Sequence, residues 1–390
     1  MRHTHTRPSF VTNFSCIGSD CEDSCCYGWG ISIDKKSFKK TLAHPELKEL
    51  ATQALRKVKK SDTEWARVTL NDDGACRFLD EQNLCQIHTK AGHELLSNTC
   101  KTYPRMSHFK DGDRYESLSL SCPEAARVIL FNSNPFHLEQ ITVNHNHAFQ
   151  SSPMWAKKAH DYSMQLLVKS DMQLEHALTA IGIIMKKTED VSKGLLGSES
   201  IGSMYQQLLI LHANGELKRH FDGFNQDTNT QQMHAFTSIQ LWLHTNKPSR
   251  GRKRFEQIHQ AILDMMEDES INMEHINTAW HQIAKPALTA HPDLFSRYLI
   301  YYVYHMNFPQ VDALTPSQAF RVMLVDFFML RCYLSVIAAK NNGLSKSDII
   351  LCFQVYHTSR QHKANYSQYV IEILNRAKFD DLPAILTLLS

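Results

Sequence analysis

The side chains best suited to chemistry are cysteines near the start of the chain. Thiolates are soft ligands, and in a reducing compartment they select zinc or iron–sulfur clusters. Eight of the ten cysteines lie close enough in sequence to share such a role: Cys16, Cys21, Cys25, Cys26, Cys76, Cys85, Cys100 and Cys122. We therefore predict a metal site in the N-terminal third of the chain.

The spacing of these thiols favours a cluster over a single ion. A tetrahedral zinc site usually has two Cys-x2-4-Cys pairs, and only Cys21 and Cys25 match that spacing. The adjacent Cys25 and Cys26 suit one ion poorly, because neighbouring side chains tend to diverge. A 4Fe-4S cluster accepts four thiolates from varied directions, so we expect this cofactor, with zinc as the alternative. Cys332 and Cys352 lie in apolar helical patterns and are expected to fill the core.

Composition narrows the class of protein. The chain has 390 residues, of which 43% are hydrophobic and 21% are charged, and its formal net charge is +2. These values are typical of a globular protein of two domains, and they give no reason to expect nucleic acid as a partner. The basic run at 247–254 is interpreted as a solvated loop between helices.

Neither a secretory signal nor a membrane span is expected. The first residues, MRHTHTRPSFVTNF, lack an apolar h-region. The most apolar segment, 319–339, is interrupted by Arg321, Asp326 and Arg331. We predict that this segment is a buried core helix and that the protein stays in the cytoplasm.

Turn and periodicity signals divide the chain near residue 135. Residues 1–135 contain short apolar pieces between turn signals, including a hairpin signal at Asp111-Gly112. Over 136–390, apolar residues recur at helical spacing, with start signals such as the capping box that begins at Thr315. We predict a mainly α protein, in which a cysteine-rich metal-binding domain with small β-hairpins precedes an all-helical domain.

Four blocks that carry all eight N-terminal cysteines resemble the flagellin lysine-N-methylase family. They are CIGSDCEDSCCYGWGISID, CRFLDEQNLCQIH, LLSNTCKTYPR and SLSLSCPEAAR. The same part is similar to a wider group of domains described as zinc- or iron-chelating. In the helical half, the resemblance is weaker and is carried by segments 295–309 and 362–370.

The resemblance implies a methyltransferase. The methyl group would pass from S-adenosylmethionine to lysine side chains of flagellin in the cytoplasm, and the N-terminal domain would hold an iron–sulfur cluster. The chain has only 14 glycines and no Gly-x-Gly-x-Gly after a predicted strand, so a Rossmann-type donor site is not expected. A donor pocket must then be built among the helices.

Two sets of side chains in the helical half are candidates for that pocket. Methyl transfer requires a neutral lysine, and aromatic faces hold cations such as the sulfonium of the donor. The donor is predicted to contact Arg297, Tyr298, Tyr302 and Arg321, and the substrate is predicted to contact Tyr301, Tyr304 and Asp326. The same patterns are also compatible with a core helix and a structural ion-pair network. No catalytic base is identified from the sequence.

Two other functions stay open from the sequence. One is a non-catalytic, metal-stapled module that captures flagellin, which binding of the methyl donor would distinguish from an enzyme. The other is a redox or radical enzyme that uses the cluster. The Cys-x3-Cys-x2-Cys loop of radical S-adenosylmethionine enzymes is missing, because Gly28 stands where its last cysteine would be.

Overall fold

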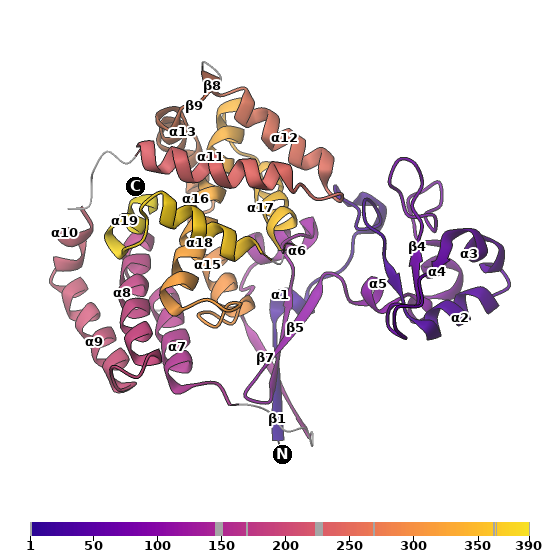
Figure 1. Cartoon of the computed structure of the whole chain (residues 1–390), viewed down its shortest axis with the longest axis horizontal. Helices are drawn as coiled ribbons and strands as arrows, with labels where there is room; N and C mark the ends of the chain where they lie inside the picture. The colour runs from indigo at the N-terminus through magenta and orange to yellow at the C-terminus, as the bar shows by residue number, and fades with distance from the viewer. Residues whose placement is uncertain are drawn as a thin grey trace.

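The computed structural model describes residues 2–144, 151–168, 171–222, 229–267, 270–361, 363 and 365–389. Figure 1 shows a large helical body, a sheet below it and a smaller lobe to one side. The body and the sheet share one hydrophobic core, whereas the lobe has a core of its own that runs from Ile31 to Leu96. The prediction of a mainly α protein with a distinct cysteine-rich part is confirmed.

The helices of the body follow the amphipathic segments predicted from the sequence. The helical apolar pattern over 157–187 is split between α7 and α8, and residues 169–170 between them lie outside the described part. In chain order the helices are α6 (Pro123–Phe131), α7 (Met154–Val168), α8 (Leu174–Ser192), α9 (Glu199–Ala213), α10 (Glu216–Asp222), α11 (Asn229–Thr245), α12 (Arg252–Leu263), α13 (Met273–Ala279), α14 (Lys285–Ala287), α15 (Leu294–His305), α16 (Pro316–Asn341), α17 (Lys346–Arg360), α18 (Tyr366–Arg376) and α19 (Leu382–Leu386).

Helix α16 is the central element of the body. It begins with the predicted capping box, in which the side chains of Thr315 and Gln318 accept each other's backbone N–H groups. By length and composition α16 could cross a membrane, but 94% of its most apolar window is buried inside the protein. The predicted core helix is therefore confirmed, and Asp326 and Arg331 must be neutralised within it.

A four-stranded sheet in the order β5-β6-β1-β7 supports one side of the body. The predicted hairpin at Asp111-Gly112 joins two of its strands, and both turn residues have the positive φ that a tight hairpin turn requires. The last strand lies within the part expected to be helical, because it pairs antiparallel with the first strand of the chain. The strands are β1 (Arg2–Pro8), β5 (Arg105–Lys110), β6 (Asp113–Leu118) and β7 (Leu138–Asn144).

The smaller lobe is built from short elements around a modest core. Its sheet has the order β2-β4-β3, with β2 (Ser32–Ile33), β3 (Leu55–Lys57) and β4 (Ala66–Val68). Its helices are α2 (Lys35–Ala43), α3 (Lys48–Ala54), α4 (Gln86–Ala91) and α5 (Asn98–Thr102). So small a core commonly needs a metal or a cross-link to be stable.

The chain passes from the body into the lobe and back. Phe10, Leu118 and Ile129 are buried in the core of the body, so the segments on both sides of the lobe pack with the helices. The chain therefore crosses between the two cores over about residues 15–30 and again over about 97–104. Four of the eight N-terminal cysteines lie on the first crossing and Cys100 lies on the second.

A buried histidine in the body makes stability depend on pH. Nδ1 of His160 lies 2.8 Å from the carbonyl oxygen of Phe308, and burial lowers the pKa of His160 to about 4. The unfolded side chain ionises near pH 6.5, so the stability that this residue contributes is complete above pH 6.5 and is lost as the pH falls toward 4. We expect the melting temperature to fall less between pH 7 and pH 4.5 in His160→Gln than in the wild type. Equal falls in the two proteins would contradict this assignment.

Candidate functional site

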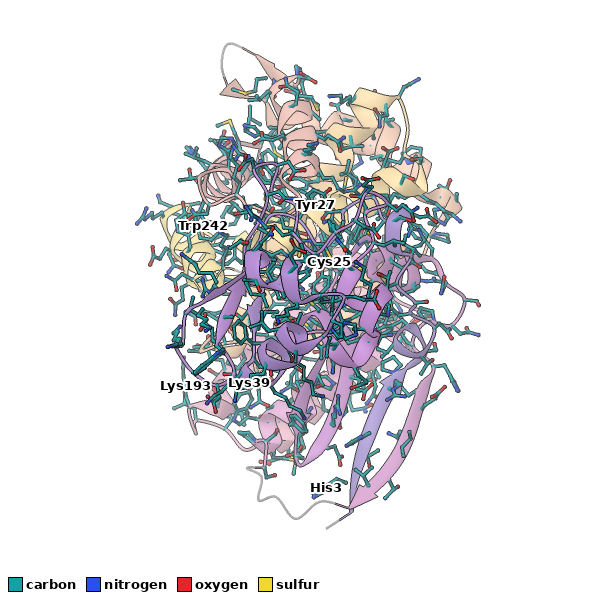
Figure 2. The ribbon with its side chains drawn as sticks, turned by 90° about the vertical axis from the view of Figure 1, so that its right-hand side faces the viewer. His3, Cys25, Tyr27, Lys39, Lys193 and Trp242 are labelled. Atoms are coloured by element: carbon teal, nitrogen blue, oxygen red, sulfur yellow. The ribbon has the colours of Figure 1, made fainter. Side chains whose placement is uncertain are left out.

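Five of the eight predicted metal ligands interact with one another in the lobe: Cys25, Cys26, Cys76, Cys85 and Cys100. In Figure 2, which views the molecule from the side of the lobe, Cys25 lies near the middle. A hydrogen bond with Cys26 lowers the pKa of Cys25 to about 7. Burial raises the pKa of Cys76 to about 11 and that of Cys100 to about 12. A metal that binds here must therefore displace thiol protons.

The local backbone directs N–H groups at these sulfur atoms. Cys85 is the N-cap of α4, where burial raises the pKa of its thiol and the N–H groups of Ile87 and His88 oppose that rise. The backbone N–H of Cys76 donates to the carbonyl of Cys26 at 2.8 Å, which ties the two cysteine-bearing loops together. Backbone hydrogen bonds to sulfur, such as those to Cys85, orient and stabilise metal-bound thiolates.

The all-sulfur donor set is compatible with a cluster or with a single thiophilic ion. Within the part of the chain that the structure describes, no three His, Cys, Asp or Glu side chains are placed to hold a metal ion. A single tetrahedral ion would need the thiols to move together, whereas a cluster several atoms across reaches thiolates that are further apart. Soft thiolates are compatible with both iron–sulfur clusters and zinc.

The other three predicted ligands are Cys16, Cys21 and Cys122, of which Cys21 also interacts with Cys25 of this group. Cys16 is exposed. The thiol of Cys21 donates a hydrogen bond to the carbonyl of Asp23 at 3.4 Å. Burial raises the pKa of Cys122 to about 12, and the neighbouring Cys21 contributes to this rise. The structure thus brings Cys21 toward Cys122 at the start of α6. The two C-terminal cysteines are fully buried, as predicted: Cys332 and Cys352.

A buried arginine joins the cysteine loops to the body. Arg250 is only 6% exposed, so the prediction that 247–254 is a solvated loop is wrong at this position. Its guanidinium donates to the hydroxyl of Tyr103 and, at 3.0 Å, to the carbonyl of Ser121. It also lowers the pKa of Cys25, although less than the hydrogen bond from Cys26 does. Sequence gave no signal for this role, because its partners are more than 100 residues away.

A cavity of about 460 Å³ lies where the lobe meets the body. One wall is the segment on both sides of Cys100, from Asn98 to Met106, and the other is formed by the ends of α15, α17 and α18. Ligand sites are common in such clefts between domains. The charged and aromatic side chains that line the cavity are Tyr103, Arg105, His305, Asp312, Arg360, Lys363 and Tyr366.

A buried ion pair forms the floor of this cavity. The carboxylate of Asp326, which is 0% exposed, lies 2.8 Å from the guanidinium of Arg360. The hydroxyl of Tyr356 donates to the same carboxylate at 2.6 Å, and the hydroxyl of Tyr366 lies 3.4 Å from it. The two hydroxyl oxygens are 2.5 Å apart. Burial raises the pKa of Asp326 to about 6, although Arg360 opposes the shift.

Several buried polar atoms beside the floor have no hydrogen-bond partner among the described residues. They are the hydroxyls of Tyr298 and Tyr302, both ring nitrogens of His357, and Nε of Arg360. The rings of Tyr298 and His357 are in edge contact, with centroids 5.6 Å apart. An unsatisfied buried polar group costs about 1–3 kcal/mol, so such groups usually mark water or ligand sites.

The sequence-predicted contacts are distributed around this region. Tyr298 and Tyr302 interact with the buried Asp326–Arg360 pair, but neither these tyrosines nor Asp326 lines the cavity itself. The hydroxyls of Tyr301 and Tyr304 donate to the backbone carbonyls of Leu118 and Glu116, and Arg297 donates to those of Leu130 and Asn132. These three side chains therefore attach α15 to the sheet and to α6.

Arg321 lies elsewhere, at a second cavity of about 330 Å³ beside α8. Its guanidinium donates to the side chain of Asn375 and to the carbonyl of Phe379. Sequence reasoning missed Arg360, Tyr356 and Tyr366. The helical periodicity of α17 places Tyr356 and Arg360 on one face, and this pattern could have identified these two residues as neighbours.

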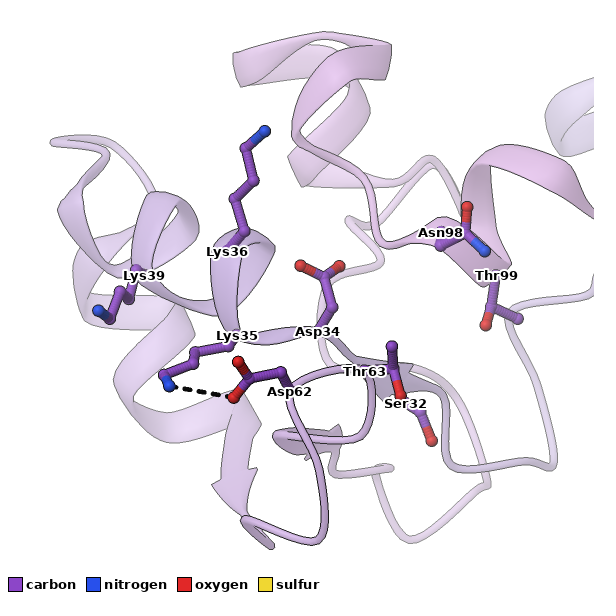
Figure 3. Close-up of a pocket in the computed structure, with 9 residues that line it drawn as sticks. All are labelled: Ser32, Asp34, Lys35, Lys36, Lys39, Asp62, Thr63, Asn98 and Thr99. Carbon is purple, nitrogen blue, oxygen red and sulfur yellow. Dashed lines mark hydrogen bonds and ion pairs between the residues drawn. The ribbon is translucent and has the colours of Figure 1, made fainter. Parts of the chain in front are cut away.

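A larger but shallow hollow lies on the lobe (Figure 3). It measures about 840 Å³ and is lined by lysines and polar residues, with Lys35 bound to Asp62 at 3.0 Å. The side chain of Asp34 caps the N-terminus of α2, where it accepts a hydrogen bond from the backbone N–H of Ser37. The cavity between lobe and body is the better candidate site, since the buried charged side chain of Arg360 lines it, whereas no described charged residue that lines the hollow on the lobe is buried.

Two family models match different parts of the chain. Residues 160–388 match the FliB lysine N-methylase C-terminal domain. Residues 15–123 match the CxxCxxCC family, a domain described as zinc- or iron-chelating.

Curated relatives are similar over nearly the whole chain. The lysine-N-methylases of Salmonella choleraesuis and Salmonella typhimurium are each 25% identical over 379 residues, which is 94% of this chain and 94% of theirs. The flagellar biosynthetic protein FliU of Salmonella muenchen is 41% identical over 130 residues, which is 33% of this chain and 77% of FliU. No solved structure matches.

Proposed function

Because the chain belongs to the FliB lysine N-methylase family, it is a lysine methyltransferase, and we propose that it transfers methyl groups from S-adenosylmethionine to lysines of flagellin. The observation that carries the proposal is the cavity over the Asp326–Arg360 pair, at the border between the two matched domains. The proposed location is the cytoplasm, and the flagellar name of one relative supports flagellin as the partner.

Methyl transfer makes three demands that this cavity can meet. The amine must be neutral and aligned with the sulfur–methyl bond, and water must be kept away from the reacting atoms. The sulfonium of the donor also benefits from aromatic neighbours, which Tyr103 and Tyr366 supply. Arg105 and Lys363 are the cations available for the carboxylate of the donor.

The residues predicted from the sequence take two roles in this proposal. Tyr298, Tyr302 and Asp326 lie behind the cavity wall that Arg360 and Tyr366 form, and they would support these two residues without contacting a ligand. Other side chains already have protein partners and would shape the site without contacting a ligand: Arg297, Tyr301, Tyr304 and Arg321.

We propose that a 4Fe-4S cluster is the metal cofactor, held by four of the five interacting thiols. When bound, such a cluster would cross-link the loops of the lobe and add a redox-capable group. Its position would also define the cavity, since Cys100 lies in α5 and the neighbouring Thr99 and Thr102 line the wall. Zinc in the same thiols would give the same cross-link without redox chemistry.

The test is a methylation assay with anaerobically purified protein, flagellin and methyl-labelled S-adenosylmethionine. We expect label on flagellin lysines, located by mass spectrometry, and no label when the donor is omitted. Binding of flagellin without transfer would support a non-catalytic capture module instead. A transfer rate that depended on reducing the cluster would support the redox alternative.

A further inference from the structure

We propose that the hydroxyl of Tyr366 and the Asp326 carboxylate behind it accept the proton that the substrate lysine loses before it attacks the methyl group. This inference rests on the proposed function and identifies the proton acceptor of the same site. Tyr366 is the only member of the network, apart from Arg360, that lines the cavity within the described residues. An amine in the cavity can therefore reach Asp326 only through it.

The geometry supplies a continuous path for the proton. It runs from the Tyr366 hydroxyl to the Tyr356 hydroxyl over 2.5 Å, and from there to Asp326 over 2.6 Å. A direct but longer path of 3.4 Å joins Tyr366 to the same carboxylate. All three side chains are buried and come from different turns of packed helices, so their positions are fixed before substrate binds.

The step is balanced in atoms and charge. The lysine ammonium gives a proton to Tyr366, Tyr366 gives its own to Tyr356, and Tyr356 gives its own to Asp326, which becomes a neutral acid. The amine lone pair then forms the nitrogen–carbon bond while the sulfur–methyl bond breaks and its electron pair stays on sulfur. The products are the methylated ammonium and the neutral thioether, and Asp326 later returns its proton to solvent.

The surroundings suit an acceptor that works near neutral pH. Burial raises the pKa of Asp326 to about 6, which leaves it ionised but basic enough to take a proton. The Arg360 cation at the cavity wall also disfavours an incoming ammonium over a neutral amine. The titratable groups that act on Asp326 are Arg360 and Tyr356 from α17, Tyr366 from α18, and Tyr298 and Tyr302 from α15.

The test compares the pH dependence of Tyr366→Phe with that of a matched control. The control is Tyr333→Phe, which also loses one buried hydroxyl, here donated to Gln240 at 2.7 Å, but lies outside the path. At pH 7 we expect kcat of Tyr366→Phe to fall about 100-fold, a typical contribution of general base catalysis. The deficit should shrink toward pH 9.5, where lysine increasingly loses its proton to solvent. The KM for the donor should not change.

The outcomes separate this inference from the proposed function. Transfer by the wild type with equal, pH-independent losses in both variants would overturn the proton path and leave the methyltransferase intact. Full activity of Tyr366→Phe would do the same. Absence of donor-dependent transfer in the wild type would instead remove the proposed function. The melting temperatures of both variants show whether a loss of activity reflects unfolding. Tyr356→Phe should show a smaller pH-dependent deficit, because the direct contact of 3.4 Å between Tyr366 and Asp326 remains.

Discussion

Replacing Cys76 or Cys100 by serine is expected to remove the metal and to abolish methylation. Cys76 is buried and Cys100 is partly buried among the five thiols that interact, and serine is a poor ligand for a soft metal. Loss of the metal should also loosen the lobe, because folding and metal binding are coupled in such small units. The measurement is iron, sulfide and zinc content of anaerobically purified protein, with its absorption spectrum.

The matched control is Cys352→Ala, which also removes a buried thiol but lies in α17 within the core of the body. We expect it to retain the metal and to lose only about 1 kcal/mol of stability through the small cavity left behind. About four iron and four sulfide per chain in the wild type would support the cluster. Stoichiometric zinc without sulfide would replace it by a structural zinc site. Full metal content in both serine variants would refute the ligand assignment.

The second large effect is expected from separating the buried ion pair at the cavity floor. Arg360→Met leaves the Asp326 carboxylate buried without its counterion, which costs about 3–5 kcal/mol for a pair as deeply buried as this one. We expect a clear fall in the melting temperature and no methylation. Circular dichroism during thermal unfolding measures the first quantity, and transfer of labelled methyl groups measures the second.

The double variant Asp326→Leu with Arg360→Met distinguishes stability from chemistry. Replacing both members of a buried pair by apolar side chains is often neutral or stabilising, so most of the lost stability should return. Activity should stay absent, because the proton acceptor and the cavity cation are both gone. Recovery of activity together with stability would show that the pair only holds the helices in place.

Local signals in the sequence predicted several features that depend on few residues. The hairpin at Asp111-Gly112 and the capping box at Thr315 follow from backbone conformations and caps set within four residues. The buried nature of α16 followed from its apolar length despite three interrupting charges. Thiol chemistry identified the cysteines as a group, and residues 15–123 match a domain described as zinc- or iron-chelating.

Pairings between distant residues were decided only by the tertiary structure. Strand β7 forms because β1, more than 130 residues earlier, offers it a partner, and no local pattern contains that information. The sequence predicts that Arg250 lies in a solvated basic loop, and only the structure shows that it is buried and donates hydrogen bonds to Tyr103 and Ser121. The sequence by itself therefore determined the thiol chemistry and the helical body. Tertiary packing decided which thiols meet and where Asp326 finds Arg360, because burial and hydrogen bonding depend on neighbours that are remote along the chain.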